Sequence, residues 1–264
     1  MAEQLHDVSR IESRLSAVRA VAGVVRAIWA LSQAQLAQVE SFSLHASIYL
    51  DWVDELVTRL AGPPVEPAAQ QTLHVVLGPE RPFCANLPAE VVRALPSDGV
   101  IGVCGRRLRE AVADVPAHAA RVVFETEGPT SVDDLDRIVE RLAQLALEHG
   151  RDRRVVIAYP QTGASGLRTV TLLSGPRSPN SVRPFDTYSP IERLLERAIA
   201  ESVSGRLRVA LAQALRTEVR TRATAAENAR HGVERQERAL TSTLRILSQE
   251  QITNELAELF AGQL

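Results

Sequence analysis

The sequence predicts a mixed fold, in which the two chain ends form a long antiparallel two-helix coiled coil and a Rossmann-like α/β domain is inserted between them. Two end segments contain few helix-breaking residues, and the segment between them alternates short apolar runs with helical stretches. Only 4% of the residues are aromatic, which suits helices that pack Ala, Val and Leu along their length. The predicted domain boundaries are 1–61, 70–180 and 188–264.

The N-terminal helix is predicted from a heptad pattern. Apolar residues recur at alternating spacings of three and four from Val8 to Val39, interrupted by Ser32. This period is typical of a left-handed coiled coil and predicts a partner helix. A second copy of the chain is one possible partner, but the C-terminal helix supplies one within the same chain. Gly62, Pro63 and Pro64 predict the end of the helix.

The middle segment predicts a doubly wound, mostly parallel sheet, because strands alternate with helices. The expected strands are 73–77, 99–104, 121–125, 154–159 and 167–173, and the expected helices are 86–95, 105–114 and 132–149. Asn86 and Ser131 are the expected N-caps of two of these helices. Gly163 and Gly166 favour a hairpin turn between the last two strands over a phosphate-binding loop.

The C-terminal helix is predicted to start at Ser189-Pro190, because a serine cap followed by proline is a common helix start, and no proline follows. The stretch from Arg216 to Arg238 is rich in Arg, Glu and Thr. We therefore expect loose packing there, with apolar positions returning after Leu240.

Catalytic chemistry is not predicted. The net charge is −2 and every basic side chain is Arg, so the sequence holds no P-loop or Schiff-base lysine. The balanced charge argues against a nucleic-acid partner. Cys84 has no histidine near it in sequence, and Asp133, Asp134 and Asp136 suit a helix N-terminus better than a metal site. No uninterrupted apolar run reaches the length of a membrane span. We expect no catalytic residue, cofactor or metal.

Three stretches resemble the gamma subunit of F-type rotary ATP synthases. Residues 15–19, Leu-Ser-Ala-Val-Arg, resemble that family's Ile-x-Ser-Val-Lys, and residues 24–28 continue in register. Residues 80–87, Glu-Arg-Pro-Phe-Cys-Ala-Asn-Leu, resemble Asp-Arg-Gly-Leu-Cys-Gly-Gly-Leu. Residues 249–259 resemble Gln-x-x-Ile-Thr-x-Glu-Leu-x-Glu-Ile, but Ser248 stands where the family has Arg.

The resemblance implies a non-catalytic central rotor stalk, which transmits torque between a membrane c-ring and a catalytic alpha-beta hexamer. The implied partners are the alpha, beta and epsilon subunits and the c-ring, with membrane association only through the complex. The implied location is the cytoplasmic face of a bacterial plasma membrane. The alternative is a coiled-coil scaffold or tether with a small-molecule-binding α/β lobe. Both H⁺ and Na⁺ coupling stay open, as do both directions of the ATP reaction.

The resemblance also implies two sets of contact residues. Those expected to contact the catalytic hexamer are Arg19, Arg26, Gln249, Thr253, Asn254, Leu256, Leu259 and Phe260. Those expected in a docking loop of the α/β domain are Arg81 and Cys84. Because the family's Arg before Gln249 is Ser248 here, we expect the contact made by Gln249 to be weakened.

Overall fold

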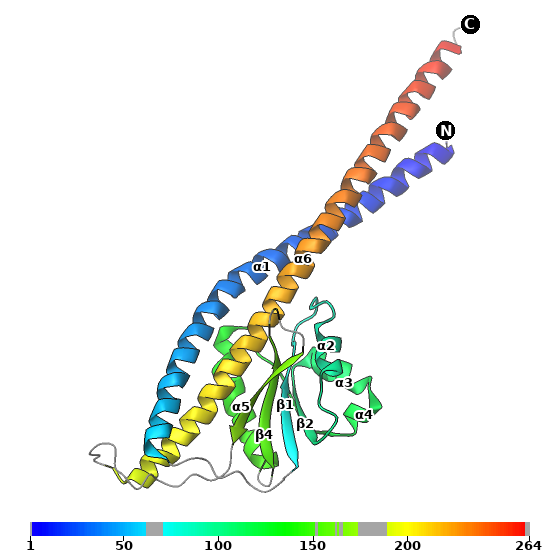
Figure 1. The fold of residues 1–264 in the computed structure, drawn as a ribbon. Coiled ribbons are helices and arrows are strands. Elements are labelled where there is room, and N and C mark those ends of the chain that lie inside the picture. Colours follow the sequence, from blue (N-terminus) through cyan, green and yellow to red (C-terminus); the bar gives the residue numbers. More distant parts are fainter. Residues whose placement is uncertain are drawn as a thin grey trace. The chain divides into compact units, whose positions relative to one another are not determined.

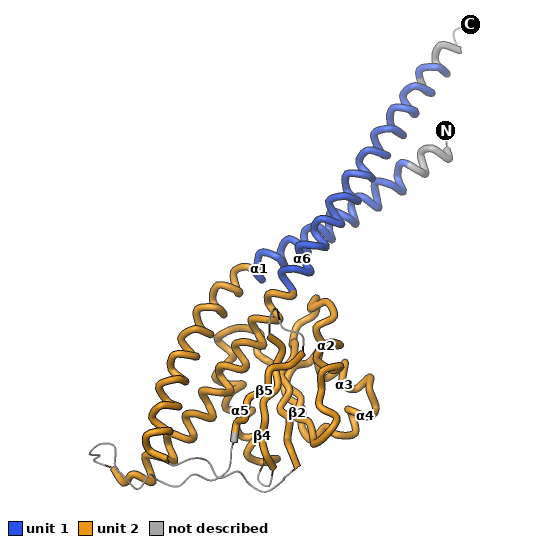
Figure 2. The backbone as a smooth tube through the Cα atoms, viewed as in Figure 1, with its two compact units in different colours: residues 1–32, 222–264 blue, residues 33–221 orange. Residues whose placement is uncertain are grey.

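The computed structural model describes residues 2–61, 71–150, 153–161, 163, 166–173 and 189–261. For residues 2–7, 173, 255 and 258–261 the description is of the backbone. The chain divides into two compact units, of which the first combines residues 1–32 with 222–264 and the second is continuous over 33–221 (Figure 2).

Two long helices begin and end the chain, as predicted. Helix α1 spans Ala2–Leu60 and α6 spans Ile191–Ala261, and each contributes to both units. In the first unit they lie side by side and antiparallel (Figure 1). The heptad pattern has the expected effect at Leu15, which is 4% exposed, whereas Val21 outside the pattern is 51% exposed. The predicted helix pairing is therefore present in the first unit.

The second unit contains a five-stranded sheet in the order β3-β2-β1-β4-β5. Its strands are β1 (Thr72–Leu77), β2 (Val100–Cys104), β3 (Val122–Thr126), β4 (Arg154–Pro160) and β5 (Leu167–Leu173). All neighbouring strands are parallel except β4 and β5, which are antiparallel. Gly163 and Gly166 have φ of 80° and 99°, which suits the predicted hairpin connection. The predicted fold class is confirmed.

Helices cover both faces of this sheet. The short helices are α2 (Leu87–Arg93), α3 (Arg106–Ala113), α4 (Pro116–Ala119), the 3₁₀ turn η1 (Val132–Asp134) and α5 (Leu135–His149). Side chains of α2 and α3 form one apolar cluster with one face of the sheet. On the other face, α5 and residues 207–219 of α6 share a larger cluster with Leu73 and Val75 of β1. The long C-terminal helix thus forms part of the core of the second unit.

Two predicted N-caps are wrong. Neither the Asn86 nor the Ser131 side chain makes a capping hydrogen bond. The chain instead enters α5 through η1, and both the backbone N–H and the hydroxyl of Thr130 donate to Asp134 Oδ2, at 3.1 and 2.5 Å. These hydrogen bonds lower the pKa of the Asp134 carboxyl. Asp134 thus fixes Thr130 ahead of η1, and its side chain makes no capping hydrogen bond to α5.

The expected loose packing after Arg216 is also wrong for the part of α6 in the second unit. Thr217, Glu218 and Val219 are 6%, 3% and 1% exposed. The Thr217 hydroxyl lies 3.2 Å from the Pro160 carbonyl oxygen and 2.9 Å from that of Gln213. Polar side chains pack closely here because backbone groups of the lobe and of α6 satisfy them.

Candidate functional site

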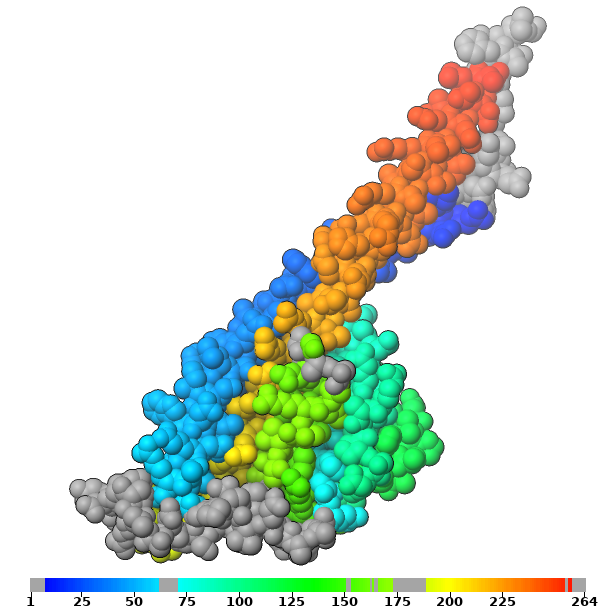
Figure 3. Space-filling view, in the orientation of Figure 1, coloured from blue at the N-terminus to red at the C-terminus, as the bar shows by residue number. Residues whose placement is uncertain are grey.

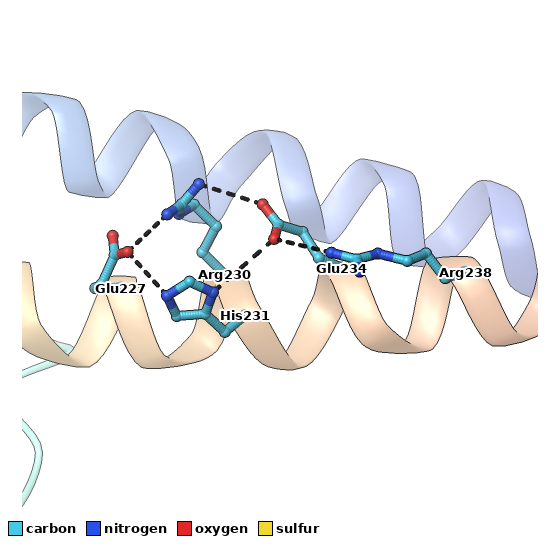
Figure 4. A network of polar contacts seen from close by, with 5 residues as sticks. All are labelled: Glu227, Arg230, His231, Glu234 and Arg238. Atoms are coloured by element: carbon cyan, nitrogen blue, oxygen red, sulfur yellow. Dashed lines mark hydrogen bonds and ion pairs between the residues drawn. The ribbon is translucent and has the colours of Figure 1, made fainter.

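The polar part of α6 in the first unit carries a chain of paired charges (Figure 4). Arg230 lies between Glu227 and Glu234, with N–O distances of 2.6 and 3.3 Å. His231 contacts Glu227 at 3.1 Å, and Arg238 continues the chain to Glu234 at 3.7 Å. The hydrogen bond from Arg230 lowers the pKa of Glu227. The charges are thus paired three or four residues apart within one helix.

Two contacts between α1 and α6 define their register in the first unit. The guanidinium carbon of Arg230 lies 6.0 Å from the ring centroid of Trp29, within cation–π range. Arg19 Nε donates to Glu237 Oε1 at 2.9 Å. Arg19 is therefore engaged with the other helix. Arg26 is exposed and forms no ion pair with another described side chain.

The C-terminal part of α6 carries most of the predicted contact residues. Gln249, Thr253 and Asn254 line a shallow groove on one face, together with Ile246 and Glu250. The Thr253 hydroxyl donates to the Gln249 backbone carbonyl oxygen at 2.9 Å, and the amide side chains of Gln249 and Asn254 are exposed.

Apolar side chains are exposed in the same part of α6. Ile252 and Leu256 are 58% and 49% exposed. The backbone of α6 extends past the start of α1 (Figure 1), and the part of α6 drawn in red is visible on the viewed face (Figure 3). The side chains of Leu259 and Phe260 lie outside the described residues. This end of the helix therefore presents amide and apolar groups together.

The loop after β1 in the second unit is held by two carboxyl groups. Glu218 of α6 accepts the backbone N–H groups of Glu80 and Arg81 at 2.9 and 3.0 Å. The Glu80 side chain accepts those of Arg106 and Gly128, both at 2.8 Å. We call Glu218, Glu80 and these four N–H groups the carboxyl bridge. The sequence did not predict it.

The same loop has a strained backbone. Phe83 and Ala85 have φ of 68° and 46°, in the left-handed region that costs a residue with a Cβ roughly 1–2 kcal/mol. Phe83 is 60% exposed, whereas Cys84 is 4% exposed and its thiol lies 3.0 Å from the Arg81 carbonyl oxygen. Phe83 is therefore exposed at the surface of this loop, whereas Cys84 is buried.

Both cysteines are buried. Burial raises the pKa of the Cys104 thiol, and the Glu80 and Glu218 carboxyl groups raise it further. A thiol that stays protonated is a poor nucleophile. Among the described residues, no group of three or more His, Cys, Asp and Glu side chains is arranged to hold a metal ion.

Helix α1 is apolar enough in places to resemble a membrane span. By length and composition alone, Val8–Leu60 qualifies, with a mean hydropathy of 1.4 over an 18-residue window. Charged residues such as Arg19 and Arg26 interrupt the apolar runs of this helix, so no unbroken run is long enough to span a membrane. The mean hydropathy over a window stays high despite these charges. A helix that packs against other protein segments can have the same length and composition.

An apolar face of α1 in the second unit is uncovered. Leu44, Ile48 and Trp52 follow one another at intervals of four residues and are 61%, 46% and 73% exposed. Val53 and Val57, on the opposite side of the helix, are buried. We call Leu44, Ile48 and Trp52 the apolar face of α1.

The fold combines two long helices, which pair antiparallel in the first unit, with an α/β lobe in the second unit. A family model described as ATP synthase matches residues 7–263. The chain belongs to this family, that of the gamma subunits of F-type ATP synthases. It is a non-catalytic subunit with a central-stalk role in a rotary ATP synthase.

Solved structures show the same fold. The Euglena gracilis mitochondrial ATP synthase contains similar chains in its OSCP/F1/c-ring structure, at 15% identity and a TM-score of 0.64, and in its rotor structure, at 14% and 0.59. The matches cover 98% and 94% of this chain, and 94% and 99% of those chains. The Tetrahymena thermophila mitochondrial central stalk/c-ring structure contains a similar chain, at 11% identity and a TM-score of 0.54. That match covers 78% of this chain and 99% of the Tetrahymena chain. No curated protein matches by sequence.

Proposed function

We propose that this central-stalk subunit transmits torque between an ion-driven c-ring and a catalytic alpha-beta hexamer, and so couples ion translocation to ATP synthesis or hydrolysis. The register-defined helix pair of the first unit carries this proposal. Torque transmission needs a rod that resists bending and slipping, and the Arg19–Glu237 and Trp29–Arg230 contacts oppose slipping of one helix along the other. The proposed domains remain 1–61, 70–180 and 188–264.

The C-terminal part of α6 is the proposed contact with the alpha and beta subunits. Exposed Gln249, Thr253 and Asn254 supply hydrogen-bonding groups, and Leu256 supplies apolar area. Apolar contacts lack directional bonds and so suit a surface that slides. Leu259, Phe260 and Arg26 belong to the same proposal. Arg19 contributes through its pairing with α6 rather than as a free cation.

The α/β lobe is the proposed docking site for the epsilon subunit and the c-ring. Its loop at 80–86 contains Arg81 and exposes Phe83 while burying Cys84. A residue held in left-handed conformation on a surface is a common feature of binding loops. The apolar face of α1 also supports assembly with other subunits, because such a surface is costly to leave in water.

The proposed location is the membrane, reached through the complex. The similar solved structures are mitochondrial, so they give no support to a bacterial compartment in particular. We propose the cytoplasmic face of a bacterial plasma membrane, which cell fractionation with the intact complex tests. Recovery of the chain away from membranes, without ATP synthase subunits, contradicts it.

The rotor proposal is tested with Gln249→Ala in the assembled complex. We expect lower ATP turnover coupled to ion translocation, because an angle-dependent hydrogen bond to the head is lost. Gln236→Ala is the matched control, since Gln236 is an exposed glutamine of the same helix. Equal turnover in both variants contradicts the contact.

Deletion of residues 246–264 separates the rotor from the scaffold alternative. A rotor loses coupling when this part of α6 is removed, because the contact with the head is gone. A tether retains its partners and loses no activity. Co-purification of the deleted chain with full coupled turnover therefore favours the scaffold.

A further inference from the structure

The carboxyl bridge connects α6 directly to the carboxyl edge of the parallel strands. Glu218 is 3% exposed, so hydrogen bonds from protein groups must replace those that its carboxyl group would make with water. Two of these come from consecutive backbone N–H groups, those of Glu80 and Arg81. Consecutive N–H groups form a concave site that suits a carboxylate. The Glu218 side chain therefore binds the backbone of the loop, and this contact does not depend on the side chains of Glu80 and Arg81.

Glu80 extends this connection to two further loops. Its side chain accepts the N–H of Arg106, just after β2, and that of Gly128, just after β3. Gly105 has a φ of 117°, and a Cβ there would collide with the Gly78 carbonyl oxygen. The loops that follow three neighbouring strands are thus joined by the Glu80 hydrogen bonds and packed closely at Gly105.

We propose that Glu218 is a positioning residue of the stalk, which makes the loop at 80–86 move together with α6. This inference rests on the proposed function, in which α6 carries torque and the loop docks another subunit. Force along α6 then reaches Phe83 through hydrogen bonds of fixed direction. Apolar contacts alone would let the loop lag behind the helix, because they are not directional.

The bridge is separable from the stability of the lobe. The apolar cluster of α5, α6 and the sheet includes Leu207, Leu211 and Leu215 of α6 and does not depend on Glu218. Without the Glu218 carboxyl, the N–H groups of Glu80 and Arg81 lose their acceptors. The left-handed residues Phe83 and Ala85 are then free to relax, while α6 stays packed on the sheet.

The first test is amide hydrogen exchange in the full chain carrying Glu218→Gln. Glutamine keeps one acceptor oxygen and replaces the other with a donor. We expect the Glu80 and Arg81 amides to exchange at least about tenfold faster, since a hydrogen bond to a charged group is lost. The control is Glu196→Gln, at an exposed glutamate of the same helix. Unchanged exchange at both amides overturns the proposal.

The second test is the number of ions pumped per ATP hydrolysed by the assembled complex. With Glu218→Gln we expect this ratio to fall while ATP hydrolysis continues. A merely structural role lowers hydrolysis and pumping together and leaves the ratio unchanged, which overturns the proposal. If the wild-type chain does not assemble with ATP synthase subunits, the proposed function fails, and the exchange result still decides whether the bridge holds the loop.

Glu80→Gln provides a second variant if Glu218→Gln prevents folding. It keeps the backbone contacts of Glu218 and weakens those to Arg106 and Gly128. Faster exchange at these two amides, together with a lower ratio of ions to ATP, supports the bridge. Wild-type exchange and ratio overturn it.

Discussion

His74 shows how a single buried residue can make this fold sensitive to pH. Its side chain lies in β1 at 8% exposure, and neither ring nitrogen has a hydrogen-bond partner among the described residues. Burial lowers the pKa of His74 below its ordinary value of 6.5, while Asp98, 3.9 Å away, opposes the shift. The folded state therefore favours the neutral ring.

We predict that acid destabilises the lobe through His74. As the pH falls below 6.5, the unfolded chain takes up a proton that the folded chain excludes, so the free energy of unfolding decreases until the lowered pKa is passed. His74→Gln should remove this part of the pH dependence in urea unfolding. The control His45→Gln, at an exposed histidine, should show the same pH dependence of unfolding as the wild type. Identical pH profiles for wild type and His74→Gln would show that the ring does not titrate in this way.

The backbone of individual residues is where sequence-based prediction failed. Phe83 adopts a left-handed conformation that its residue type disfavours. The Glu218 carboxyl finds its partners 137 and 138 residues away. Neither feature has a local sequence signal, because both depend on how distant segments meet. The prediction of an Asn86 cap failed for the opposite reason. Asparagine is a favourable residue type at a helix N-terminus, but the Asn86 side chain makes no hydrogen bond to the helix.

At the scale of whole elements, the sequence was a reliable guide. The α1 helix was predicted from its heptad pattern and the strands mainly from short apolar runs, and both signals are local properties of one segment. The resemblance between residues 249–259 and the gamma family was also local in sequence, and the family model confirms the membership. The sequence could not predict that Leu207 and Leu211 of α6 would complete the core of the α/β lobe.

The helix pair of the first unit gives a prediction at this scale. Leu15→Ala removes a buried side chain and should cost about 2–3 kcal/mol of unfolding free energy. Val21→Ala, at a side chain that is 51% exposed, should cost less than about 0.5 kcal/mol. Thermal unfolding followed by far-ultraviolet circular dichroism measures both. Equal losses would mean that the heptad positions do not face the partner helix.

At the scale of the whole molecule, the exposed apolar face of α1 is a surface on which the chain can associate. Leu44→Ser combined with Trp52→Ser changes only the apolar face of α1, so the free energy of unfolding should stay within about 0.5 kcal/mol of wild type. Self-association of the isolated chain, measured by sedimentation velocity, should decrease. Val53→Ser, on the buried side, should instead destabilise the fold. A comparable loss of stability in the double variant would show that the face is part of the core.

The paired charges on α6 have an electrical consequence for a turning shaft. An isolated charge has a long-range field, whereas a positive and a negative group 2.6–3.7 Å apart on one helix present their surroundings with a dipole, whose field decays faster. The electrostatic potential at any protein that surrounds this part of α6 would therefore vary little as Arg230 and its neighbours rotate. Shaft rotation at this level should be nearly independent of salt concentration, and any preferred angles would come from shape rather than from charge.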